Sequence, residues 1–144
     1  MANYLLKKLL GSKVYGGETL LFDNVVLAAA DANNADHDQW VDRIAHRKNL
    51  YITINESDFA LRASRFKMGD QQRARLGHYT RNLTSDVAVY LDFTRAPTVK
   101  SSHSYFADRK VSGSEVEEVF DSILKGNKAE DITTFDPHTG AFRV

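Results

Sequence analysis

The chain has 144 residues, 19 basic and 19 acidic side chains, a formal net charge of zero and no cysteine. This length suits one domain, and 42% hydrophobic residues are enough to fill its core. The balanced charge excludes a general attraction to nucleic acid or anionic membranes, and the lack of cysteine excludes cysteine nucleophiles and cysteine-ligated zinc. No apolar run approaches the ~20 residues of a membrane span. No signal peptide is recognisable, so we expect a cytoplasmic protein.

The first half of the chain alternates predicted helices and strands. Residues Ala2–Leu10 place leucines at helical spacing, and Gly11 ends that helix. The continuous apolar run Leu20–Ala30 is typical of a strand that is buried on both faces. Residues Asp38–Arg47 carry one apolar helical stripe, and Leu50–Ile54 is a strand rich in β-branched and aromatic residues.

The alternation continues after the second strand. Ser57 is predicted to cap a helix that runs to Phe66, and the polar segment Lys67–Ser85 is predicted to be a surface excursion. Residues Val87–Phe93 form a third predicted strand. This order predicts an α/β fold with a three-stranded, mostly parallel sheet flanked by helices.

A last amphipathic helix and a polar tail complete the chain. Ser112 and Glu115 form a capping-box pattern before the apolar stripe, and Gly126 follows the end of that stripe. The chain is therefore divided into a domain over residues 1–126 and a C-terminal tail over residues 127–144, whose order the sequence does not predict.

Polar side chains that can carry chemistry follow each predicted strand. Ligands of open parallel sheets bind beyond the carboxyl ends of the strands. Asp31 and Asp36 follow the first strand, Asp58 the second, and His103 the third. An acid on one such loop can orient a histidine on a later loop, and the histidine then accepts a proton from a nucleophile. The alternative is an aspartate that stabilises a helix N-terminus and a solvated loop histidine.

Several segments resemble an esterase/lipase-like branch of the α/β-hydrolase superfamily. The segments are FDNVVLAAAD at residues 22–31, LYITINESDFALRAS at 50–64, RLGHY at 75–79 and HSYF at 103–106. The resemblance covers about residues 1–125 and implies that the chain is the C-terminal half of that fold. It implies Asp58 as the acid and His103 as the base of a catalytic triad, in agreement with their chain order.

The same resemblance places the nucleophilic serine outside this chain. The stretch MANYLL at residues 1–6 resembles what directly follows the nucleophile in that branch, so the serine is expected immediately before Met1. Ala2 stands where the branch usually has glycine. No Gly-x-Ser-x-Gly motif occurs in the chain, and the serines beside His103 are interpreted as loop residues.

Other clusters favour structural interpretations. The contiguous residues Asp36, His37 and Asp38 point in different directions, so they suit a helix start better than a metal site. The basic residues of segment 62–81 lack the interleaved aromatics that stack nucleic-acid bases, which predicts a solvated surface. No glycine-rich phosphate loop follows a predicted strand. We therefore predict no metal and no cofactor.

Two functional hypotheses follow. The first is the C-terminal portion of a serine hydrolase that acts on a small ester or acyl substrate and is inactive alone, because the nucleophile is missing. The second is a non-enzymatic binding or assembly module on half of an α/β-hydrolase scaffold. The apolar run around Val25–Ala29 has no protecting charge or proline, so we expect a homodimer through an exposed sheet edge there, and neither nucleic-acid nor membrane partners.

Overall fold

A computed structural model describes residues 22–44, 47–66, 74–107 and 112–144. The helix predicted over residues 2–10 lies outside these ranges. Within them, no helix combines the length and apolar character that a membrane crossing requires.

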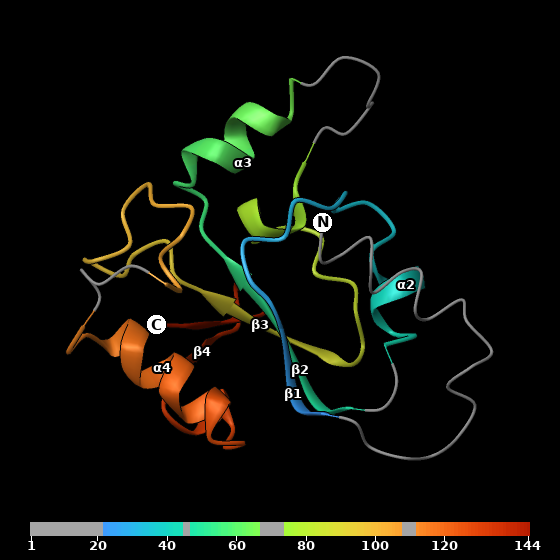
Figure 1. The fold of residues 1–144 in the computed structure, drawn as a ribbon. Coiled ribbons are helices and arrows are strands. Elements are labelled where there is room, and N and C mark those ends of the chain that lie inside the picture. The colour runs from blue at the N-terminus through green and yellow to red at the C-terminus, as the bar shows by residue number, and fades with distance from the viewer. Residues whose placement is uncertain (1–21, 45–46, 67–73, 108–111) are drawn as a thin grey trace.

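The described chain is built around one sheet with five strands (Figure 1). In chain order the strands are β1 (Phe22–Leu27), β2 (Arg47–Ile54), β3 (Ala88–Asp92), β4 (Thr134–Asp136) and β5 (Ala141–Arg143). Their spatial order is β1-β2-β3-β5-β4, and all neighbouring pairs are parallel except β4 and β5. The α/β class and the three parallel strands are confirmed.

The count of three strands is wrong, because residues 127–144 add two more. Asp136 begins the turn between β4 and β5, where its side chain accepts a hydrogen bond from the backbone N–H of His138 at 3.1 Å. Gly140 ends the turn with φ +76°, a conformation that favours glycine. Each strand has only three residues, too few to produce a readable alternation. Pairing of β5 with β3 orders this segment.

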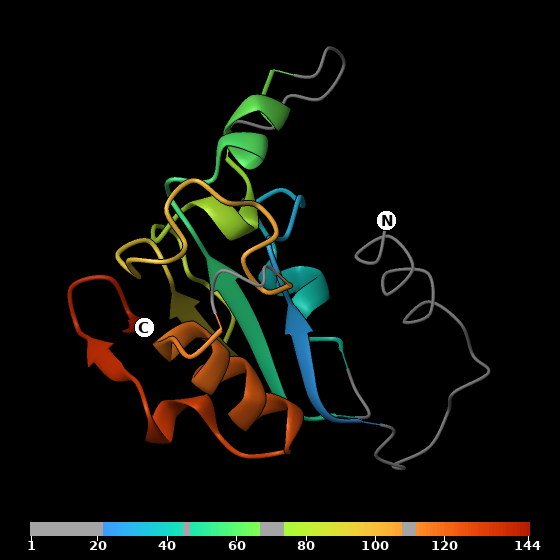
Figure 2. The same cartoon turned by 60° about the vertical axis from the view of Figure 1, so that its left-hand side comes forward.

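Helices cover both faces of the sheet (Figure 2). The helix α4 (Glu115–Leu124) packs on one face, against a core that includes Tyr51 and Leu91. The short helix α2 (Asp38–Val41) packs on the other face. Its core contains Leu50, Ile52, Ile54 and Tyr90, so neighbouring residues of β2 and β3 point into opposite cores. This alternation is the period of two expected for strands with both faces buried.

The start of α4 differs from the prediction by two residues. Ser114 is the N-cap, and the side chain of Glu117 accepts a hydrogen bond from the backbone N–H of Gly113. The Ser114 side chain makes no cap hydrogen bond to the helix, so the contact between Gly113 and Glu117 is not the reciprocal capping box predicted for Ser112 and Glu115. At the other end, Gly126 adopts φ +81° and closes the helix as predicted.

A buried turn covers the carboxyl ends of β1 and β2. The 3₁₀ turn η2 (Leu76–His78) lies inside the segment predicted to be a surface excursion, yet all three of its residues are buried. Gly77 donates its N–H to the carbonyl of Ala30 at 3.0 Å and accepts from the N–H of Asn55 at 2.9 Å. A Cβ at Gly77 would lie 2.5 Å from the backbone nitrogen of Ala30, so only glycine allows this approach.

Candidate active site

Asp58 is placed by the turn that joins β2 to the next helix. It is the N-cap of α3 (Phe59–Ser64), and its Oδ1 accepts a hydrogen bond from the N–H of Leu61 at 3.0 Å. The prediction that Ser57 caps this helix is therefore wrong by one residue. Aspartate is as good an N-cap as serine, and sequence alone does not distinguish two neighbours of this kind. The Asp58 side chain is completely buried.

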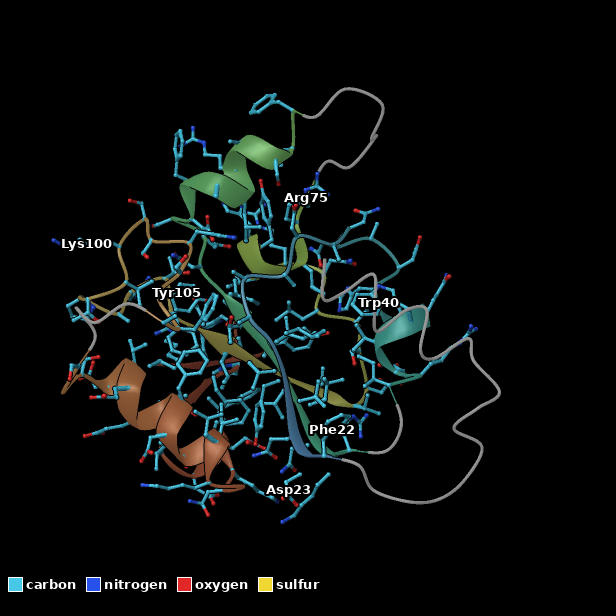
Figure 3. The ribbon with its side chains drawn as sticks, viewed as in Figure 1. Phe22, Asp23, Trp40, Arg75, Lys100 and Tyr105 are labelled. Atoms are coloured by element: carbon cyan, nitrogen blue, oxygen red, sulfur yellow. The ribbon has the colours of Figure 1, made fainter. Side chains whose placement is uncertain are left out.

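His103 is placed by the loop that follows β3. Two residues beyond it, Tyr105 is completely buried and its hydroxyl hydrogen-bonds the hydroxyl of Thr53 on β2 (Figure 3). The ring of Tyr105 packs against Phe93 with 5.3 Å between the ring centroids. Burial raises the pKa of the Tyr105 hydroxyl, so it stays neutral. This anchor holds the loop against the sheet while the His103 side chain remains 43% exposed.

The two loops bring the acid and the histidine into direct contact. His103 Nδ1 lies 2.8 Å from Asp58 Oδ2. Because a buried carboxylate accepts hydrogen bonds, Nδ1 carries the proton and Nε2 keeps its lone pair in the neutral ring. Within the described ranges, no hydrogen bond occupies Nε2. The predicted contact is confirmed, and the capping role that was its alternative is also present, on the other carboxylate oxygen.

The other candidate acids have different partners. Asp31 Oδ1 lies 3.1 Å from Arg75 Nε and accepts a hydrogen bond from the hydroxyl of Ser64 at 2.8 Å. Arg75 is buried beneath α3 and also donates to the Ser64 carbonyl, so the prediction of a solvated basic segment is wrong at this position (Figure 3). Asp36 is exposed and has φ +54°. Of the predicted acids, Asp58 is the one in contact with His103.

His37 is a structural histidine, as the sequence predicts. It is completely buried, its Nδ1 lies 2.7 Å from the carbonyl of Asn34, and its Nε2 lies 2.6 Å from the hydroxyl of Tyr90. A carbonyl only accepts, so Nδ1 donates to it and the tyrosine hydroxyl donates to Nε2. Burial raises the pKa of Tyr90 to about 12, which keeps that donor protonated. No group of three metal-binding side chains is found among the described residues.

His78 is a buried histidine whose environment sequence reasoning missed. It lies in η2 and is only 6% exposed, although the sequence favours a surface position. Neither ring nitrogen has a hydrogen-bond partner among the described residues. Burial, with the nearby positive charge of Arg65 as the next cause, lowers the pKa of His78, so its ring is neutral at physiological pH.

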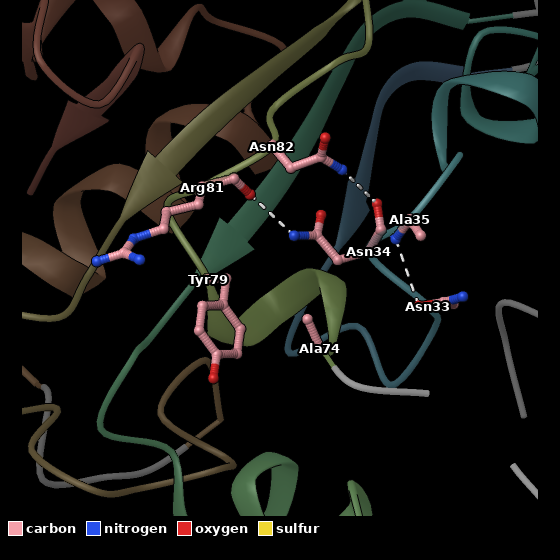
Figure 4. Close-up of a pocket in the computed structure, with 7 residues that line it drawn as sticks. All are labelled: Asn33, Asn34, Ala35, Ala74, Tyr79, Arg81 and Asn82. Atoms are coloured by element: carbon pink, nitrogen blue, oxygen red, sulfur yellow. Dashed lines mark hydrogen bonds between the residues drawn. The ribbon is translucent and has the colours of Figure 1, made fainter. Parts of the chain in front are cut away.

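A pocket lies apart from the acid–histidine pair (Figure 4). Its wall is held by hydrogen bonds from Asn34 Nδ2 to the carbonyl of Arg81 at 2.8 Å and from Asn82 Nδ2 to the carbonyl of Asn34 at 3.0 Å. The lining residues are Asn33, Asn34, Ala35, Ala74, Tyr79, Arg81 and Asn82. Neither Asp58 nor His103 lines it, so it is not the predicted site.

A nucleophile is not found beside His103 in the described part of the chain. No serine or threonine hydroxyl there hydrogen-bonds Nε2 of His103. Comparison of the chain with protein-family models, curated proteins and solved structures gives no match. The geometry of the acid and the histidine therefore carries the functional proposal.

Proposed function

We propose that the chain supplies the acid and the base of a serine-hydrolase-type site, as the C-terminal part of an α/β-hydrolase. One observation carries the proposal: buried Asp58 holds Nδ1 of half-exposed His103 at 2.8 Å, at the carboxyl ends of neighbouring parallel strands. The resemblance of residues 50–64 and 103–106 to esterase/lipase-like proteins supports it.

The chemistry requires a hydroxyl from outside the described residues. As that oxygen attacks the carbonyl carbon of a small ester, its proton moves to His103 Nε2. The imidazolium, stabilised by the Asp58 carboxylate, then returns the proton to the leaving alcohol as the C–O bond breaks. A water molecule then attacks the acyl-enzyme with the same proton transfers and releases the carboxylic acid and the free hydroxyl.

The chain by itself is proposed to be inactive as a hydrolase. Removal of a serine nucleophile costs on the order of a million-fold in turnover in subtilisin. Purified chain should therefore hydrolyse p-nitrophenyl acetate at the buffer rate. Turnover that disappears in His103→Ala would show that a hydroxyl of this chain is the nucleophile, and would overturn that part of the proposal.

The basicity of His103 can be tested without a nucleophile. Diethyl pyrocarbonate reacts with an unprotonated imidazole nitrogen, forming a carbethoxy adduct with release of ethanol and carbon dioxide. We expect His103 to react rapidly through Nε2, and we expect Asp58→Asn to slow that reaction severalfold, because the carboxylate no longer holds the proton on Nδ1. Peptide mass spectrometry follows each adduct over time.

His138 is the matched internal control for this experiment. It is an exposed histidine in the turn between β4 and β5, on the opposite side of the sheet from β1. Its rate should be the same in the wild-type chain and in Asp58→Asn. Equal rates at His103 in the two proteins would mean that Asp58 does not control the histidine, and the proposal would fail.

The edge of β1 supports the second candidate, an assembly module. Among the described strands, β1 pairs only with β2, so its other edge has no strand partner there. Phe22 at its start is 56% exposed (Figure 3). A homodimer through this edge would give twice the chain mass of 16.2 kDa in sedimentation equilibrium, and Phe22→Lys would weaken it by placing charge on the edge. A concentration-independent monomer would contradict self-association.

A further inference from the structure

We propose that Asn55 is a positioning residue that holds the His103 loop in register with Asp58. The inference rests on the proposed function, because it concerns how the acid–histidine pair of that site is maintained. Asn55 directly follows β2 and is completely buried, although asparagine is seldom buried without a structural reason. Its hydrogen bonds join three separate segments.

The side-chain amide of Asn55 donates two hydrogen bonds to the loop that carries His103. Nδ2 donates to the carbonyl of Lys100 at 3.0 Å and to the carbonyl of Ser102 at 3.1 Å. The Ser102 carbonyl belongs to the peptide bond that leads into His103, so this contact orients the backbone from which the imidazole projects. Both amide protons of Asn55 are used on this one loop.

The remaining groups of Asn55 hold the acid side of the site. Its Oδ1 accepts from the N–H of Ser57 at 3.0 Å, and its carbonyl accepts from the N–H of Asp58 at 3.1 Å. Its own N–H donates to the carbonyl of Gly77 in η2 at 2.9 Å. One side chain therefore connects the turn that presents the carboxylate with the loop that presents the imidazole.

Lys100 shows that the loop is held in an unusual conformation. Its φ is +47°, in the left-handed region that lysine rarely adopts, and it lies at the outer end of the loop (Figure 3). A non-glycine residue persists there when its surroundings determine the conformation. The hydrogen bond from Asn55 to the Lys100 carbonyl is such a constraint.

These contacts predict what the loss of the amide would do. Asn55→Asp keeps the size of the side chain and the acceptor for Ser57, but it replaces both donors with an oxygen that repels the two loop carbonyls. The loop should then move away, and His103 should lose its hydrogen bond to Asp58. Without that acceptor, the proton is no longer confined to Nδ1.

The experiment is ¹⁵N NMR of the histidine-labelled full chain at about pH 8, where imidazole is neutral. Wild-type His103 should show protonated Nδ1 and a lone pair on Nε2. In Asn55→Asp the Nδ1-protonated fraction should fall severalfold. Asn24→Asp is the matched control, because Asn24 Nδ2 donates to two main-chain carbonyls, of Ile123 at 2.7 Å and of Asn127 at 3.1 Å, remote from His103. It should weaken stability without changing the His103 tautomer.

Two variants of Lys100 test the same inference without touching the buried asparagine. Lys100→Gly accepts the left-handed conformation and should keep the wild-type tautomer, whereas Lys100→Val resists it and should lose it. Lys100 is exposed, so folding should survive both changes. An unchanged tautomer in Asn55→Asp, or in Lys100→Val if the former does not fold, overturns the positioning role. A wild-type His103 without protonated Nδ1 overturns the proposed function instead.

Discussion

Two histidines that follow parallel strands of the sheet show how differently one residue type can be used. His37, after β1, has both ring nitrogens hydrogen-bonded and no exposed surface. His103, after β3, has one nitrogen on a buried carboxylate and a ring that is 43% exposed. The ring of His37 has no free nitrogen for a substrate, whereas Nε2 of His103 accepts no hydrogen bond from the residues that the structure describes. The two rings therefore differ at Nε2. In His37 this nitrogen is bonded to Tyr90, which makes the residue structural, and in His103 it is available to act as a base.

The largest expected difference between the two histidines is in how much each contributes to the free energy of unfolding. His37→Leu would leave the Tyr90 O–H without its acceptor and would remove one of the two donors to the Asn34 carbonyl, so we expect a loss of about 2 kcal/mol in the free energy of unfolding. His103→Leu should cost about 1 kcal/mol or less, because water can replace an exposed ring beside Asp58. Urea denaturation measures both. Equal losses would show that the two histidines are held alike.

Substitutions of Asp58 should separate its two roles. Asp58→Ala removes the cap of α3 and the partner of His103, and should cost about 2 kcal/mol. Asp58→Asn keeps a good cap and should stay within about 0.5 kcal/mol of wild type. Its amide then faces His103, so the ring should move its proton to Nε2. A cost as large for Asn as for Ala, in the same denaturation assay, would mean that the carboxylate rather than the cap dominates stability.

His78 extends the comparison to a buried ring without partners. Its pKa is lowered in the folded chain, so the unfolded chain binds a proton first as the pH falls below about 6.5. This histidine therefore removes stability between that pH and its lower folded pKa. His78→Leu should abolish this loss and gain up to about 1 kcal/mol at neutral pH, with a larger gain at about pH 5.

Thermal unfolding at the two pH values measures the effect of His78. The other titrating groups are shared by both proteins, so the difference between their pH dependences reports this ring. Parallel curves for wild type and variant would show that His78 is not an acid-sensitive group.

The long elements could be predicted because each repeats its pattern several times. The strand β1 and the apolar stripe of α4 fall within their predicted segments. The strand β2 contains the predicted run Leu50–Ile54 but begins earlier, at Arg47, and the helix predicted over Asp38–Arg47 ends at Val41. The strands β4 and β5 could not be predicted, since three residues do not establish a period and their order depends on pairing with β3. The burial of η2 was not predicted because its segment is polar. Nothing in that sequence indicates that the backbone of Gly77 packs directly against the backbone of Ala30.

For the site, the sequence by itself determined that Asp58 and His103 follow successive parallel strands, which places both at one edge of the sheet. Only the tertiary structure decided which acid meets the histidine. Asp31 follows β1, one strand further from β3 than β2 is, and Arg75 and Ser64 hold its carboxylate. Such choices depend on hydrogen bonds between segments distant in the chain, and on the directions of single side chains, which no local pattern encodes.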